Sequence, residues 1–396
     1  MKNKAIAALL ALSASIVPCA QASIGMGVLM IWPTARSTAL AGAMTGLADE
    51  ADATYFNPAG LAFQTTAKAD IDYGSWLPGM YQGLFYASAA GGAPVRVPFL
   101  QGRNAFIAGS LTYLTTGEVD IVNERGDYLG RFVAWQGAAS VCIAAPLTSA
   151  LGAGIGLKLA RGVHASMEND WPWEFNPELV LEPGGNATTV AADLGILFRP
   201  SRHLGFGATV ANIGPRVSYR LDGSEAAGPT ANLPRMVRLG LCWTPVENQL
   251  VRLRVMPELD KVLVGMFRDT TGTKTFGRKL GEEWKDVWKA VGVEATVFNA
   301  VSLRLGYFED LTGQRGDIVL EKEGQTYHYG VWDALTRKHL GRYKSLGLCW
   351  GLGFGSDKLR FDFSSDAAIY DFPTSNWKFQ LVSNDIGGLI QRLRGR

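Results

Sequence analysis

The chain has 396 residues, of which 47% are hydrophobic, 19% are charged and 47 are glycine, and its formal net charge is +2. A net charge this small does not indicate the clustered basic face that a nucleic-acid-binding protein needs. Few charges and many glycines are unusual for a soluble exported protein and favour a membrane β-barrel. Beyond the N-terminal segment, no run of about 18 apolar residues suggests a transmembrane helix.

Residues 1–22 have the layout of a cleaved secretory signal peptide. Two lysines precede an apolar run over 5–17, and Ala20-Gln21-Ala22 provides a small-residue cleavage site. Cys19 admits lipoprotein processing as an alternative, but the proline directly before it fits a lipidation site poorly. We therefore expect an exported protein whose mature chain begins at residue 23.

Residues 23–68 form a separate N-terminal segment in which small side chains dominate. Small side chains allow a backbone to pack closely in a confined space. The segment contains Asn57-Pro58-Ala59-Gly60, and the Asn-Pro pair favours a turn before the first strand. We expect a plug or lumen-lining element, with a simple periplasmic lead-in as the alternative.

From residue 69 to residue 384 the chain alternates apolar and polar residues with period 2. In 359–363, for example, Leu359, Phe361 and Phe363 alternate with Arg360 and Asp362. Such alternation is typical of a barrel wall that has lipid on one side and a lumen on the other. Strands are expected near 69–75, 81–90, 105–113, 132–145, 151–161, 189–199, 203–212, 235–243, 250–259, 288–299, 301–308, 344–355, 358–365 and 376–384.

The expected fold class is therefore all-β, a transmembrane antiparallel β-barrel of about fourteen strands with a short N-terminal plug segment. A soluble β-sandwich or propeller is the alternative. Short connections such as 146–150 alternate with long ones such as 162–188, as in barrels with short periplasmic turns and long outer loops. The connection 91–104 falls on the periplasmic side, where a short turn is expected. Its length indicates a periplasmic excursion or a misplaced second strand.

The last residues, 385–396, follow the final strand and are expected to form an amphipathic periplasmic tail. Ile386, Leu389, Ile390 and Leu393 recur at helical spacing between and before basic residues. Two glycines within this stretch weaken the helix.

Basic residues fall on the inward parity of the predicted strands. They are Arg238, Arg252, Arg254, Arg304, Lys358, Arg360 and Lys378. A basic lumen favours anionic solutes; alternatively, it is a hydrated core in which arginines pair with acids or with plug carbonyls.

The long loop over 162–188 concentrates Trp171, Trp173 and Phe175. Exposed aromatic residues often anchor protein interfaces, so this loop is a candidate partner-binding site. The alternatives are that the rings fold into the barrel or join the aromatic girdle at the membrane interface.

No residue pattern indicates catalysis, a metal site or a cofactor. The four histidines, at 164, 203, 328 and 339, form neither a metal motif nor a recognisable triad. Cys142, Cys242 and Cys349 each lie in an apolar run and are expected to be buried small hydrophobic residues. We expect a protein that is not an enzyme.

The Asn57-Pro58-Ala59-Gly60 turn resembles the hallmark of FadL-like outer-membrane barrels. Within that superfamily, the ordered stretches 36–42, 48–53, 55–61 and 303–309 resemble the PorV/PorQ family. The family's barrels commonly end on a strand with a terminal aromatic residue, and the tail here departs from that pattern.

The resemblance implies an outer-membrane location, a fourteen-stranded barrel and contact with outer-membrane lipid. It also implies a type IX secretion role: binding the C-terminal signal domain of exported cargo at the cell surface, with a translocon and a surface sortase as partners. The alternative it implies is a FadL-like channel for hydrophobic compounds, in which the plug opens a path.

Overall fold

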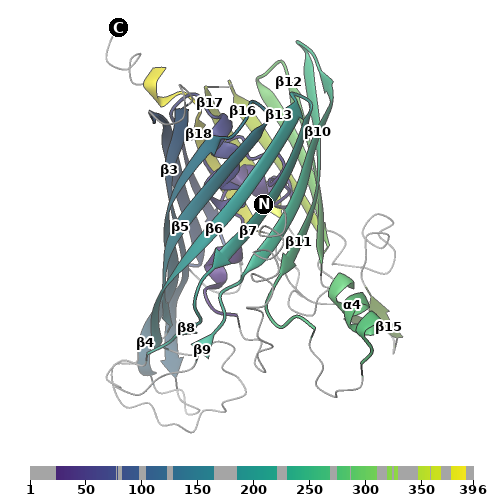
Figure 1. The fold of residues 1–396 in the computed structure, drawn as a ribbon. Helices are drawn as coiled ribbons and strands as arrows, with labels where there is room; N and C mark the ends of the chain where they lie inside the picture. Colours follow the sequence, from purple (N-terminus) through teal and green to yellow (C-terminus); the bar gives the residue numbers. More distant parts are fainter. Residues whose placement is uncertain are drawn as a thin grey trace.

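A computed structural model describes residues 24–76, 78, 83–97, 104–122, 128–164, 185–220, 230–267, 274–285, 287–309, 319–322, 325–328, 347–356, 358–366 and 376–388. In this part of the chain fourteen antiparallel strands close into a barrel, which confirms the predicted fold class (Figure 1). The predicted signal peptide lies outside the described residues.

The barrel wall consists of strands that pair with their neighbours along the chain. They are β1 (Lys68–Ser75), β2 (Phe85–Arg96), β3 (Asn104–Val122), β4 (Tyr128–Pro146), β5 (Leu151–His164), β6 (Gly185–Ser201), β7 (Leu204–Ile213), β10 (Met236–Glu247), β11 (Val251–Val262), β12 (Trp288–Val297), β13 (Val301–Glu309), β16 (Leu348–Gly355), β17 (Leu359–Asp366) and β18 (Asn376–Ser383). β1 pairs with β18, and Ala69 lies opposite Ser383, which closes the ring. A closed ring has no unpaired edge, as a sheet within hydrocarbon requires.

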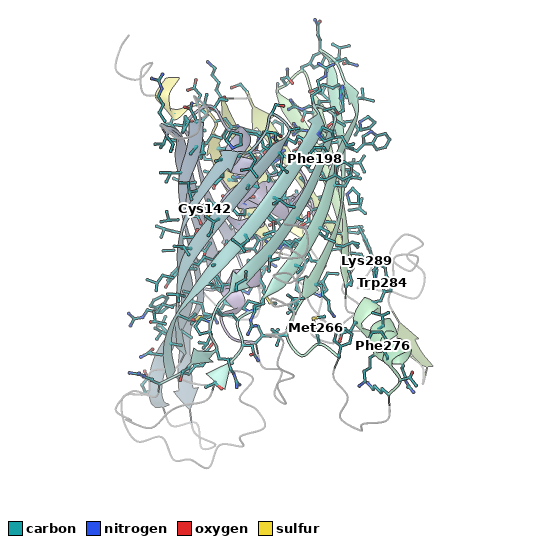
Figure 2. All side chains as sticks on the ribbon, in the orientation of Figure 1. Cys142, Phe198, Met266, Phe276, Trp284 and Lys289 are labelled. Carbon is teal, nitrogen blue, oxygen red and sulfur yellow. The ribbon has the colours of Figure 1, made fainter. Side chains whose placement is uncertain are left out.

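Successive residues of the wall strands face opposite sides. In β17, Phe361 is 44% exposed, whereas the neighbouring Asp362 is fully buried. Phe198 of β6 is likewise exposed on the outside of the wall, and Cys142 of β4 is buried (Figure 2). The outward rows are therefore apolar and suited to lipid, while the polar rows line the interior.

The two ends of the barrel differ in their connections. At one end β4 is joined to β5, β10 to β11, β12 to β13 and β16 to β17 by turns of a few residues. At the other end most connections are longer, as between β5 and β6, and the β3–β4 connection, which covers 123–127, is the short one. Because barrels of this kind place long loops outside the cell, we call these the periplasmic end and the outer end.

The predicted boundaries are wrong for the second and third strands. β2 continues to Arg96, so its connection to β3 covers only 97–103. Its residues from Ala87 to Ala93 are nearly all small, and they show no contrast between apolar and polar faces. β3 continues to Val122, and its pairing with β4 shifts register after Thr115. That bulge interrupts the alternation and hid the outer part of the hairpin.

Several short elements lie in the connections rather than in the wall. They are β8 (Val217–Ser218), β9 (Thr230–Ala231), β14 (Val319–Lys322), β15 (Gln325–His328) and α4 (Phe276–Lys285). The sequence pattern missed α4 and treated its residues as loop. A helical turn occupies 386–388, and the rest of the predicted tail lies outside the described residues.

None of the helices in the described ranges combines the length and hydropathy needed to cross a bilayer.

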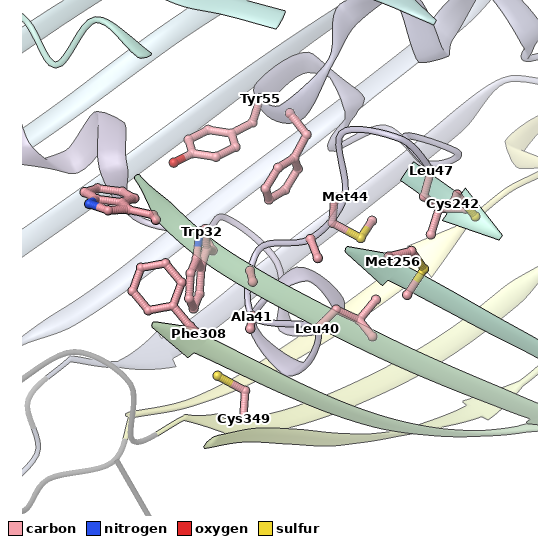
Figure 3. Packing of buried hydrophobic residues seen from close by; sticks show 14 of the residues in the cluster. Trp32, Leu40, Ala41, Met44, Leu47, Tyr55, Cys242, Met256, Phe308 and Cys349 are labelled. Atoms are coloured by element: carbon pink, nitrogen blue, oxygen red, sulfur yellow. The ribbon is translucent and has the colours of Figure 1, made fainter. Parts of the chain in front are cut away.

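The N-terminal residues 24–63 lie inside the barrel and are called the plug here (Figure 1). The plug contains η1 (Gly27–Met30), α2 (Ala35–Ala39), α3 (Ala53–Phe56) and η2 (Pro58–Phe63). α2 begins at a capping box, in which the Thr34 side chain accepts from the Ser37 amide. Plug side chains pack against the wall in a buried cluster, where Trp32 meets Phe308 edge to face at 5.2 Å (Figure 3).

Candidate functional site: the plug and its contacts with the wall

The predicted Asn57-Pro58-Ala59-Gly60 turn lies in the plug, where it starts η2 and joins the plug to the wall. The Asn57 side chain accepts a hydrogen bond from the Ala59 amide at 3.1 Å. Its amide donates to the Thr45 carbonyl at 3.1 Å and to the Ile196 carbonyl of β6 at 2.9 Å. Pro58 takes the first helical position, where its missing amide hydrogen costs nothing. One side chain therefore connects two parts of the plug to a wall strand.

Replacing Asn57 by alanine is expected to lower the stability of the folded protein by about 1–3 kcal/mol, because the change removes partners from buried polar groups. The urea midpoint of unfolding measures this loss. Asn248→Ala is the matched control, since Asn248 accepts from two amides of an exposed periplasmic turn. Equal midpoints for the two variants would contradict a structural role for Asn57.

Glycines of the wall allow the plug backbone to come close. A Cβ atom at Gly195 would lie 2.2 Å from the Asn57 side-chain oxygen, and one at Gly207 would lie 2.0 Å from the Thr45 carbonyl oxygen. A Cβ at Gly154 would lie 2.4 Å from the Pro58 carbonyl carbon. No other residue leaves room at these positions, so these inward glycines are fitted to the plug.

Arg36 of α2 is the centre of the ionic contacts between plug and wall, and its side chain is 2% exposed. It lies 2.6 Å from Asp49 and 2.8 Å from Glu50, both in the plug. It also donates two hydrogen bonds to Glu294 of β12, at 2.8 and 2.9 Å. The paired geometry with Glu294 is the strong, orientation-specific form of an arginine–carboxylate contact.

Three of the predicted lumen-facing arginines complete this arrangement. Arg254 contacts Asp49 at 3.1 Å and Glu294 at 3.0 Å. Arg304 and Arg360 both contact Asp362, and they reach Glu294 and Glu50 respectively. We call the whole set the plug–wall network: Arg36, Asp49, Glu50, Arg254, Glu294, Arg304, Arg360 and Asp362.

Burial and the network shift the ionisation of the plug's charged groups. Burial alone would lower the pKa of Arg36, but its three carboxylate partners raise that pKa well above its usual value. Burial alone would raise the pKa of Asp49, but two arginines hold it well below its usual value. For Asp52, burial and the nearby Glu50 raise the pKa to about 7. Asp49 therefore stays ionised near neutral pH, whereas Asp52 exchanges a proton there.

The other predicted basic residues occupy separate positions. Arg238 donates to the Tyr55 carbonyl at 2.7 Å, and Lys378 donates to the Trp32 carbonyl. Arg252 lines a cavity at the periplasmic end. Lys358 was predicted on the inward parity and is the exception, because its side chain is 58% exposed in the turn before β17, 3.7 Å from Asp385.

A polar cavity of about 290 Å³ lies on the periplasmic side of the plug. Arg36 and Asp49 of the plug line it, and Lys68 and Asn384, at the periplasmic ends of β1 and β18, contribute to its edge. Charged and amide side chains of this kind suit a water-filled space.

Towards the outer end the plug packs against the wall through apolar side chains. A buried cluster there includes Val28 and Leu29 of the plug, with Tyr86 of β2 and Val217 of β8. Beside it, a small cavity of about 30 Å³ separates the plug from β2, β3 and β4. Its lining combines Val28, Leu29 and Ala138 with hydroxyl side chains and with the charged groups of Asp52, Asp70 and Lys158.

The remaining predictions concern the aromatic loop, the cysteines and metal binding. Trp171, Trp173 and Phe175 fall within 165–184, which the structure does not describe. The three cysteines at 142, 242 and 349 are buried, as predicted. Within the described ranges, no cluster of three or more His, Cys, Asp or Glu side chains is placed to hold a metal ion.

The sequence interpretation missed Arg36 and Glu294 as site residues. Glu294 carried a usable signal, since Gly292, Glu294 and Thr296 share one parity that alternates with valine and alanine. Arg36 carried none, because nothing local shows that a plug helix will lie against β12.

Comparisons with known proteins were made for family, sequence and structure. No family model and no curated protein matches the chain. Among solved structures it is similar to the TodX deltaS2S3 mutant monoaromatic hydrocarbon channel, with 11% identity and a TM-score of 0.48 over 88% of this chain and 97% of that chain. The toluene transporter TbuX of Ralstonia pickettii has 11% identity and a TM-score of 0.48, over 88% and 96%. A FadL homologue of Pseudomonas aeruginosa has 10% identity and a TM-score of 0.46, over 88% and 97%. Similarities this weak assign neither a family nor an activity.

Proposed function

We propose that this chain is an outer-membrane channel for small hydrophobic compounds, in which the plug is the gate. One observation carries the proposal: the plug packs against the wall through apolar side chains towards the outer end and borders a polar cavity at the periplasmic end. A porin for polar solutes has a polar, water-filled lumen instead. The free energy of an apolar solute falls when it leaves water for the apolar side chains towards the outer end, in proportion to the apolar area that it buries.

The position of the plug supports a gate rather than a permanent core. Besides the apolar packing, its contacts with the wall include buried hydrogen bonds and ion pairs, as at Asn57 and Arg36. Polar contacts of this kind have two well-defined states, made and broken, and water entering from the periplasmic cavity can replace them. A shift of the plug would then open a path from the outer end to the periplasmic cavity.

The type IX secretion role implied by the resemblance to the PorV/PorQ family stays a prediction. The aromatic loop that would bind cargo lies outside the described residues. Binding of a secreted C-terminal signal domain to the purified barrel is the direct measurement of that role, and it is independent of solute uptake.

Uptake of toluene, a small apolar probe, tests the channel. Ala138 faces the small cavity from β4, and Ala138→Leu is expected to reduce toluene uptake nearly to the level of a deletion strain. A space of about 30 Å³ holds about one water molecule and not toluene, so the solute passes only when the plug moves. The isobutyl group of leucine overfills this space and blocks the path that the movement would open.

Ala139→Leu is the matched control. Ala139 is the next residue of the same strand and is exposed on the outer face. Cells with the Ala139→Leu variant should therefore take up toluene as fast as cells with the unsubstituted protein. Unchanged uptake in the deletion strain, or equal uptake by the two variants, would overturn the proposed function.

A further inference from the structure

α4 lies outside the barrel wall, beside the outer ends of β11 and β12 (Figure 1). Contacts of Glu283 and Trp284 hold it there. Glu283 forms an ion pair with Lys261 of β11 at 2.7 Å and accepts from the Phe267 amide. The Lys289 ammonium of β12 lies over the Trp284 ring, 6.0 Å from its centroid (Figure 2). The wall therefore sets the height and the rotation of the helix.

The helix displays an apolar stripe that the described part of the protein does not cover. Phe276, Leu280 and Trp284 are spaced four residues apart and share one face. They are 72%, 53% and 60% exposed. Phe267, itself 40% exposed, stacks on Phe276 with ring centroids 6.3 Å apart and extends the stripe. A helix of a soluble protein would turn such a face towards the core.

The stripe continues the lipid-facing surface of the wall. Lys289, which contacts Trp284, borders an apolar groove of about 680 Å³ on the outer face of β6, β7 and β10–β12. Leu259 and Val291 line this groove next to Lys289, and both are exposed. The surface that meets acyl chains on the wall therefore runs directly into the surface of the helix.

We propose that α4 is an interfacial helix that lies in the outer leaflet of the membrane, with Phe276, Leu280 and Trp284 inserted between acyl chains. The helix lies level with the outer ends of the strands, where the headgroups meet the hydrocarbon. Aromatic side chains are enriched at this boundary. Arg278 lies on the opposite side of the helix, facing the anionic headgroup region, as in other interfacial helices. The helix would fix the depth of the barrel and seat one side of its outer end on lipid.

Site-specific fluorescence tests the proposal in the full chain. The environment-sensitive dye NBD is attached at Leu280→Cys, and at Arg278→Cys as the matched control from the opposite face. Cys142, Cys242 and Cys349 are buried, and the unsubstituted protein measures their background labelling. The labelled proteins are reconstituted in phosphatidylcholine–phosphatidylglycerol vesicles with and without lipids that carry a doxyl quencher on the acyl chain, below the headgroup.

At position 280 we expect emission at shorter wavelength and roughly twofold quenching by the doxyl lipids, since the apolar face of such a helix lies about 5–10 Å below the headgroups. Position 278 should show little of either. Phe276→Cys gives a second reading from the stripe if the change at 280 disturbs the helix.

Equal quenching at 278 and 280, or no quenching at 276 and 280, would overturn the proposal. A wavelength shift that grows with the protein-to-lipid ratio, without quenching, would also overturn it and would identify a second copy of the chain as the occupant. These readings involve no transport, so they stand or fall independently of the proposed channel.

Discussion

Glu294→Gln is expected to destabilise the folded protein by about 3–5 kcal/mol, the usual cost of breaking a buried ion pair by removing one charge. Glu294 contacts Arg36 and Arg304 at 2.8 Å and Arg254 at 3.0 Å. Glutamine keeps the size of the side chain and loses the charge, so the buried guanidinium groups of Arg36 and Arg304 and the partly buried one of Arg254 lose a shared counter-ion. The urea midpoint of unfolding, followed by tryptophan fluorescence, measures the effect.

The same substitution at Glu247 is the control. Glu247 is the last residue of β10, at the periplasmic end, 3.9 Å from an Arg202 side chain that is 77% exposed. An exposed pair of this kind contributes about 0–1 kcal/mol, so Glu247→Gln should unfold close to the unsubstituted protein. If the free energy of unfolding of Glu294→Gln also lies within about 1 kcal/mol of that of the unsubstituted protein, the plug–wall network does not hold the plug.

Gly207→Ala is expected to displace the plug while the barrel remains closed. The new Cβ would lie 2.0 Å from the Thr45 carbonyl oxygen, and both sides of that contact are backbone that cannot rotate away. Overpacking of this kind costs about 1–3 kcal/mol, and the plug is the part able to move. Arg36, only 2% exposed in the native state, should then become accessible to trypsin.

Limited trypsin digestion followed by N-terminal sequencing detects cleavage after Arg36. Gly109→Ala is the matched control, because a Cβ there would lie 3.4 Å from its nearest neighbour, the Ser140 carbonyl oxygen. The heat-dependent gel mobility of the barrel confirms closure in both variants. Full protection of Arg36 in Gly207→Ala would show that the plug tolerates the contact.

The strand pattern was visible in the sequence because it depends on neighbouring residues alone. A side chain of β17 faces lipid or lumen according to its parity, as Phe361 and Asp362 show. The pattern was lost wherever side chains carried no contrast, as in the small residues of β2, or where a bulge broke the alternation, as after Thr115 of β3.

α4 was missed for a different reason. Its apolar residues recur every four positions, but the helix is short and contains two glycines, which lower helix propensity. It forms beside the ends of β11 and β12, where Lys261 and Lys289 contact it. Tertiary contacts of this kind, rather than propensity, stabilise most helices of this length.

By itself the sequence determined a closed wall of alternating strands and a compact N-terminal segment rich in small residues. Only the tertiary structure decided that this segment fills the lumen and that Arg36 meets Glu294, 258 residues away in the chain. The physical reason is that alternation is a local property of a strand. The partner of a buried charge, by contrast, is set by ring closure and by the depth at which the plug is seated.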